Sequence, residues 1–211
     1  MNNHVAAKPT YDDADLAGCC GLYCGLCPRY QSRAASRCPG CHAGDQRTYC
    51  SVCRCCAGKR DLTTCAECEE YPCERLLRVI GVGVGIDSFI SHKPALPNLE
   101  RIREAGLDVY LEEQRVRRLL VEDLLADYND GRSMTFYCTA CALMPVDPLR
   151  VALESASEDA VEGRVDATTR KARAKAMRAA IEKLAHEMEI DLRLTRKCEE
   201  ARIELSERRT T

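Results

Sequence analysis

The sequence predicts two successive parts, a small, irregular, cysteine-rich domain and then a mainly α-helical domain. Of the 16 Cys among the 211 residues, 13 lie between Cys19 and Cys73. From residue 98 onward, apolar residues recur at helical spacing instead. Large apolar side chains are scarce, with no Trp and two Phe, so the first part cannot bury enough apolar surface to offset its conformational entropy. Because it needs cross-links, we expect a small metal-stabilised, irregular cysteine-rich domain followed by a mainly α-helical domain.

Charge and hydropathy exclude several classes of partner. The formal net charge is -2, with 30% charged residues, and this balance argues against bulk nucleic acid or an anionic membrane as a partner of the whole chain. Residues 1–10 lack the features of a secretory signal, and the longest apolar run, 79–86, is too short to span a bilayer. We therefore expect a cytoplasmic protein. Since the cytosol keeps thiols reduced, metal ligation is favoured over the alternative, a disulfide scaffold.

The order of segments follows from composition and periodicity. A short helix is expected to leave Cys73 and end at Gly81, and a helix over 98–128 to be interrupted at Gly106. An apolar segment at 135–144 and a helix at 149–157 follow. The expected boundaries are 1–18 for a flexible N-terminal lead, 19–78 for the metal-binding domain, 79–97 for a connector, 98–157 for the helical domain and 165–205 for a charged C-terminal helix.

Two features of these segments have alternative interpretations. The Gly-rich stretch 81–85 follows a helix rather than a strand, so we expect a connector and not a nucleotide-binding loop. In the C-terminal helix, five basic residues and no acidic one lie in 170–178. A solvated face is favoured over a nucleic-acid patch, because no aromatic residue is interleaved there. The apolar side of this helix is expected to consist of Ala172, Met177, Ile181, Leu184 and Met188.

The spacing of the cysteines is typical of metal ligands. Four C-x2-C pairs form two successive sets, Cys24-x2-Cys27 with Cys38-x2-Cys41 and then Cys50-x2-Cys53 with Cys65-x2-Cys68. Each pair places two sulfurs on one side of a turn, and two turns complete the four-thiolate tetrahedron of structural zinc. A 4Fe-4S cluster uses the same ligation, so spacing leaves the metal open. The remaining thiols permit a third centre or other groupings: Cys19, Cys20, Cys55, Cys56 and Cys73.

Further interpretations concern one cysteine motif and several single residues. The spacing Cys20-x3-Cys24-x2-Cys27 also occurs in radical enzymes that cleave S-adenosylmethionine, but the long α/β barrel that they need does not follow. For Cys138 and Cys141 burial and ligation are both open, and Cys198 is expected to be a free thiol. Next to Cys41, His42 is able to replace a thiolate, although the excess of Cys favours thiolates. No nucleophile–base arrangement surrounds His92, which we expect to be a surface or capping residue.

Several motifs resemble a known family. They are Cys20-Gly-Leu-Tyr-Cys24-Gly-Leu-Cys27-Pro-Arg-Tyr30, Cys38-Pro-Gly-Cys41 and Cys65-Ala-Glu-Cys68-Glu-Glu-Tyr-Pro-Cys73-Glu-Arg-Leu76, followed by Asn98-Leu-Glu-Arg-Ile-Arg-Glu-Ala-Gly106 and Leu111-Glu-Glu-Gln114. Together they resemble an uncharacterised cysteine-rich domain-of-unknown-function family of anaerobic bacteria and archaea. The resemblance implies a set of recurring metal ligands, namely Cys20, Cys24, Cys27, Cys38, Cys41, Cys50, Cys53, Cys56, Cys65, Cys68 and Cys73. It implies no activity, and its anaerobic distribution favours iron–sulfur chemistry.

These observations lead to three hypotheses of function. The first is a metal-binding protein with two or three all-cysteine sites, most simply structural zinc, that scaffolds a helical domain which binds another protein. An iron–sulfur protein, acting in electron transfer or as accessory to an anaerobic enzyme, is the alternative. Nucleic-acid binding is a minor third. Because no nucleophile–base constellation or carboxylate pair stands out, we expect no independent catalytic activity. The oligomeric state stays open, as does whether the C-terminal helix folds back or pairs with a second copy.

Overall fold

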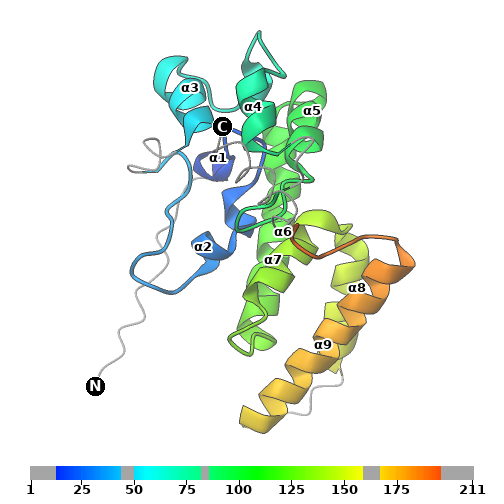
Figure 1. Ribbon diagram of the computed structural model, residues 1–211. Coiled ribbons are helices and arrows are strands. Elements are labelled where there is room, and N and C mark those ends of the chain that lie inside the picture. The colour runs from blue at the N-terminus through cyan, green and yellow to red at the C-terminus, as the bar shows by residue number, and fades with distance from the viewer. Residues whose placement is uncertain (1–12, 44–49, 82–85, 159–166, 196–211) are drawn as a thin grey trace, which may run out of the picture.

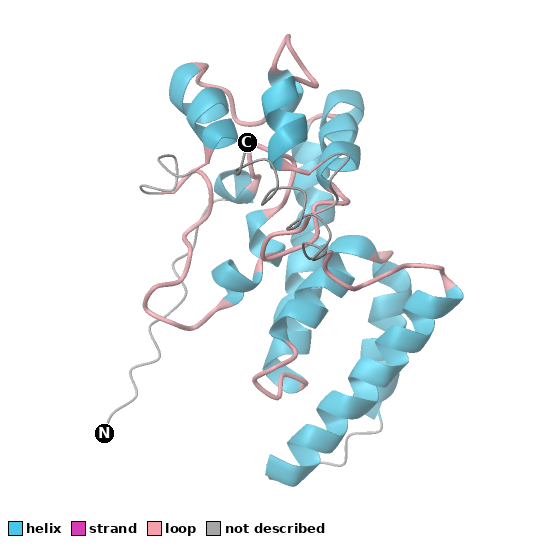
Figure 2. Ribbon diagram, viewed as in Figure 1, coloured by secondary structure: helices cyan, strands magenta, loops and turns pink. Residues whose placement is uncertain are grey.

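The computed structural model describes residues 13–43, 50–81, 86–158 and 167–195 (Figure 1). Within these ranges the secondary structure is helical and contains no strand (Figure 2). The cysteine-rich part contains α1 (Asp13–Leu16), η1 (Cys24–Leu26), α2 (Pro28–Gln31), α3 (Ser51–Lys59), η3 (Cys65–Glu67) and α4 (Glu74–Val79). The helical part contains α5 (Ala95–Ala105), α6 (Leu107–Asp127), α7 (Met134–Leu143), α8 (Val146–Glu158) and α9 (Ala167–Glu187). None of the described helices is long and apolar enough to cross a membrane.

The break at Gly106 is confirmed. Helices α5 and α6 meet there, and Gly106 has a φ of 91°, which a glycine adopts without the steric cost of a Cβ. The start of α5 differs from the sequence prediction, because the helix begins at Ala95, directly after Pro94. Asn98, at which the sequence predicts the helix to begin, lies inside α5 and donates from Nδ2 to the carbonyl of Gly21 at 2.8 Å. This residue therefore joins the two parts of the chain.

The C-terminal helix folds back on its own chain. Its buried face consists of Ala174, Met177, Ile181 and Ala185, and it packs against α8 and beside α7 (Figure 1). Ala172 and Met188, expected on this face, are exposed. The buried face of the helix begins at Ala174 and not at Ala172.

The end of α9 also differs from the predicted limit of residue 205. Ile190 N donates to Ala185 O at 2.8 Å and Glu189 N to His186 O at 3.1 Å, with Glu189 at a φ of 57°. These two hydrogen bonds around a residue in the left-handed conformation form a helix-terminating motif that usually contains Gly. Because Glu occupies the position, the sequence carried no stop signal; residues 196–205 lie outside the described residues.

The cysteine-rich part is more helical than predicted. Helix α3 buries Val52, Cys53 and Cys56 on one side, a spacing of one helical face. Cys53 and Cys56 thus occupy positions typical of apolar residues on a helix. When these residues are counted only as ligands, the sequence shows no helical periodicity here.

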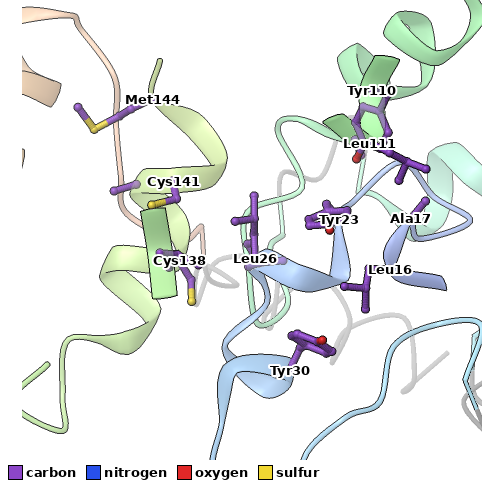
Figure 3. Packing of buried hydrophobic residues seen from close by; sticks show 14 of the residues in the cluster. Leu16, Ala17, Tyr23, Leu26, Tyr30, Tyr110, Leu111, Cys138, Cys141 and Met144 are labelled. Atoms are coloured by element: carbon purple, nitrogen blue, oxygen red, sulfur yellow. The ribbon is translucent and has the colours of Figure 1, made fainter. Parts of the chain in front are cut away.

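One hydrophobic core runs through both parts. Tyr23 and Leu26 of the cysteine-rich part lie in the same buried cluster as Tyr110 of α6 and Cys138 of α7. Figure 3 shows Leu26 between Tyr23 and the α7 cysteines. Accordingly η1 packs against both α6 and α7. The two predicted parts therefore share a core, and the cysteine-rich segment is held on the helical body.

The connector is fastened to the end of the described chain. Asp87 accepts hydrogen bonds from the backbone N–H groups of His92 (2.7 Å) and Thr195 (2.8 Å), and its own N–H donates to the carbonyl of Thr195 (2.9 Å). His92 binds the Ile80 carbonyl at 3.2 Å and Ser88 at 2.9 Å, which agrees with a capping role. Most of the Gly-rich stretch, 82–85, lies outside the described residues.

Candidate metal centre

Two of the four C-x2-C pairs adopt the same backbone turn. In η1 the N–H of Cys27 donates to the carbonyl of Cys24 at 2.9 Å, and in η3 the N–H of Cys68 donates to that of Cys65 at 3.2 Å. The backbone angles after the two turns match, with φ and ψ of -83° and 133° at Cys27 and -78° and 132° at Cys68. Side chains on either side of such a turn point to one side, which is the arrangement that two ligands of one ion require.

The other two pairs are built differently. Cys50 is the N-cap of α3, so Cys50 and Cys53 lie on the first turn of a helix, with Arg54 N donating to Cys50 O at 2.9 Å. The pair formed by Cys38 and Cys41 turns at Gly40, whose φ of 110° suits glycine. The four pairs therefore use three different local backbone conformations.

A first group of thiols gathers around Cys24 and Cys41, as the sequence predicts. Their Sγ atoms are 3.6 Å apart. This is far longer than a disulfide of about 2 Å and close to the edge of about 3.8 Å expected for a tetrahedron with Zn–S bonds of 2.3 Å. Hydrogen bonding to Cys24 and burial raise the pKa of Cys41. Burial, with Cys38 and Cys41 nearby, raises the pKa of Cys27.

A second group surrounds Cys19, a residue that the predicted ligand set omitted. Its Sγ lies 3.6 Å from that of Cys53 and 3.8 Å from His42 Nε2. A hydrogen bond from Cys56, helped by His42 and Cys53, lowers the pKa of Cys19 to about 4. Burial, and after it the neighbouring Cys19, raise the pKa of Cys53 to about 12. The motif comparison favoured the neighbouring Cys20, whose pKa is raised mainly by burial.

A third group lines a cavity of about 20 Å³, which has room for one water-sized particle. The thiols on its walls are Cys55, Cys56, Cys65, Cys68 and Cys73. A hydrogen bond from Cys56 lowers the pKa of Cys65. The sequence predicts that Cys50-x2-Cys53 and Cys65-x2-Cys68 together bind one ion. The structure differs, because Cys53 contacts Cys19 while Cys65 contacts Cys56.

The thiols meet as hydrogen-bonded neighbours. No disulfide joins any of the cysteines in the described ranges. Nor do three or more His, Cys, Asp or Glu side chains there form a group that could hold a metal ion as they stand. Binding would replace S–H hydrogen bonds with metal–sulfur bonds and release the protons, as metal capture by thiols does generally.

Cys138 and Cys141 belong to a different environment. Both are fully buried in α7, and burial raises the pKa of Cys141 to about 12. Figure 3 places them beside Leu26 and near Met144, within the apolar core. Arg117 donates to the carbonyls of Cys141 (2.7 Å) and Met144 (2.6 Å), which closes the C-terminal end of α7. Their surroundings favour burial over ligation, while Cys198 lies outside the described residues.

Part of the basic stretch on α9 packs on the chain itself. The guanidinium of Arg173 lies over the ring of Tyr128 at 5.1 Å, and that of Arg178 over Phe136 at 4.3 Å. Arg178 also pairs with Glu182 at 2.9 Å. Two of the five basic residues therefore fasten α9 to the helical body.

No family model, curated protein or solved structure matches this chain. The resemblance to the cysteine-rich family accordingly remains an expectation from the motifs.

Proposed function

We propose that this chain is a cytoplasmic metal-binding protein whose cysteine-rich segment holds structural zinc in all-cysteine sites and fixes a helical body that binds another protein. The observation that carries the proposal is the convergence of thiols from separate segments, with Cys24 and Cys41 at the spacing of a zinc–thiolate edge. Spacing and contacts together favour one site formed by Cys24, Cys27, Cys38 and Cys41. The cavity favours a second, formed by Cys55, Cys65, Cys68 and Cys73.

The proposed metal is structural because the thiols are attached directly to the helical body. Gly21, between the first cysteines, accepts hydrogen bonds from Asn98 and Tyr110. Beside the other turn, Arg103 donates to the carbonyl of Ala66 at 2.8 Å. Binding of one Zn²⁺ by thiolates contributes about 10 kcal/mol in small peptides, which is comparable to the whole stability of a typical domain. Through these contacts the metal would set the position of α5 and α6.

An iron–sulfur protein is the second candidate. It is favoured by the number of thiols, because Cys20 and Cys50 lie beside Cys41 and are surplus to the two sites above. A 4Fe-4S cluster is bound by four Cys thiolates, the same protein ligands as an all-cysteine zinc site. Nucleic-acid binding stays a minor alternative, because Arg173 and Arg178 stack on the chain's own aromatic rings.

Elemental analysis with an absorption spectrum, on protein made and purified without oxygen with iron and zinc supplied, tests the proposal. We expect zinc at two or three equivalents per chain and no visible colour. Iron with acid-labile sulfide and a band near 400 nm would favour the iron–sulfur alternative, and a metal-free folded chain would refute both.

A matched pair of variants links the metal to the assigned thiols. Cys24→Ser should lose about one equivalent of zinc and destabilise the chain, because one tetrahedral ligand is missing. Cys141→Ala removes a thiol outside the three groups and should keep the full metal content. Equal metal content in both variants would contradict the assignment.

A further inference from the structure

Four side chains remain together after the all-cysteine sites are assigned. Cys19, Cys53 and Cys56 are almost completely buried, at 2%, 1% and 2% exposure. His42, which follows the Cys38–Cys41 turn, brings its Nε2 to 3.8 Å from Cys19 Sγ. These residues come from three segments of the chain, and three of them are thiols at hydrogen-bond contact.

Two of their separations are close to those expected between donors of one coordination sphere. For a tetrahedral zinc with three sulfurs at about 2.3 Å and one nitrogen at about 2.0 Å, neighbouring sulfurs lie about 3.8 Å apart, and sulfur and nitrogen about 3.5 Å. The observed separations are 3.6 Å for Cys19 and Cys53 and 3.8 Å for Cys19 and His42. Cys53 and Cys56 lie three residues apart on α3, where helical geometry places them on one face.

We propose that Cys19, Cys53, Cys56 and His42 form a separate Cys3His zinc site, distinct in its donor set from the all-cysteine sites. The inference rests on the proposed function and assigns a ligand role to Cys19 and to an imidazole. Cys19 Sγ now lies at the centre of the group, in contact with the other three donors. Metal binding would require this sulfur to move from the centre to one corner of the coordination sphere.

Contacts with the backbone place the group between two other segments. The carbonyl of Cys19 accepts a hydrogen bond from Cys65 N at 2.9 Å. The thiol of Cys53 donates to the carbonyl of Cys41 at 3.3 Å, a bond that would be lost when Cys53 binds metal as a thiolate. The site therefore lies between the other two groups of thiols. Burial argues against the competing role of Cys19 as a nucleophile, because a reactive thiol must be open to its substrate.

Cadmium substitution tests the donor set directly. The full chain, stripped and reloaded anaerobically with ¹¹³Cd²⁺, should give resonances of two kinds, because ¹¹³Cd nuclei bound to four sulfurs are less shielded than those bound to three sulfurs and one nitrogen. His42→Ala should abolish the three-sulfur resonance and lower the zinc content by about one equivalent. His42→Cys should restore the zinc content and move that resonance into the four-sulfur range. His186→Ala, at an exposed histidine of α9, is the control and should change neither.

The outcomes separate the two proposals. Wild-type chain that binds no zinc or cadmium would overturn the proposed function and this site together. Two results would overturn the Cys3His site alone while metal is still bound. One is a spectrum with all resonances in the four-sulfur range, and the other is a spectrum that neither His42 variant changes. Cys19→Ser gives an independent readout, since loss of one equivalent supports the site and unaltered metal content contradicts it. The His42 variants decide if Cys19→Ser fails to fold.

Discussion

Replacing Gly21 by Ala should weaken the packing of the cysteine-rich segment on the helical body. Gly21 has a φ of 87°, and a Cβ added there would lie 2.2 Å from the carbonyl oxygen of Ala95 and 2.7 Å from Leu99 Cγ. The first neighbour is backbone at the start of α5, so it cannot move aside as a flexible side chain would. The carbonyl of Gly21 also accepts the hydrogen bonds from Asn98 and Tyr110, and displacement of this segment would weaken both.

The expected cost has two components. A left-handed backbone costs a residue with a Cβ about 1–2 kcal/mol, and forcing atoms into a filled space adds about 1–3 kcal/mol. Gly21→Ala should therefore lower the free energy of unfolding by about 2–5 kcal/mol. Gly131 is the matched control, because its φ is 90° and nothing lies within 4 Å of an added Cβ. Gly131→Ala should cost only the backbone component, about 1–2 kcal/mol.

Urea unfolding of metal-loaded protein, followed by circular dichroism at 222 nm without oxygen, measures both variants. Both Gly→Ala changes lower the entropy of the unfolded chain in the same way. The difference in unfolding free energy between the two variants therefore isolates the steric contact with α5. We expect Gly21→Ala to be less stable than Gly131→Ala by at least about 1 kcal/mol. Equal destabilisation would refute the close packing of this turn on α5.

Two further predictions concern α7. Arg117→Ala leaves the carbonyls of Cys141 and Met144 without their buried donor and should lower the unfolding free energy by about 2–4 kcal/mol. Arg150→Ala, which removes an exposed pair with Asp147, should cost less than about 0.5 kcal/mol, and similar values for both would contradict the buried role of Arg117. Because burial raises the pKa of Cys141 to about 12, this thiol is protonated at pH 8 and gains thiolate only as the pH rises toward 12. Iodoacetamide at pH 8 should leave it unmodified in the folded protein and alkylate it after unfolding, as peptide mass spectrometry would show; equally fast labelling in both states would count against its burial.

The helical body was largely predictable because its signals are local. Apolar periodicity and Gly106 define α5 and α6 well, since both the helix face and its interruption depend on neighbouring residues. The end of α9 at Glu187 was not predictable, because Glu189 adopts a conformation usually taken by Gly. The hydrogen bonds between Asp87 and Thr195 were not predictable either, because they join residues 108 positions apart.

In the candidate site, the spacing predicts the contact of Cys24 with Cys41 but not that of Cys53 with Cys19. The contact of Cys24 with Cys41 follows from two adjacent C-x2-C pairs, and a short loop joins them. Cys53 meets Cys19 instead of the next pair along the chain, because α3 directs both of its buried thiols toward the N-terminal segment. A signal for α3 was present in the spacing of Val52, Cys53 and Cys56, once Cys is counted as an apolar residue.

The hydrogen bond from Tyr110 to the carbonyl of Gly21 joins residues 89 positions apart. Ribosomes synthesise chains from the N-terminus at about 5–20 residues per second, so Tyr110 is added about 4–18 s after Gly21. The first cysteines thus exist for seconds before the helix that supports them has been made. During that interval their thiols are accessible to oxidants and, under the proposed function, to the zinc that they would bind.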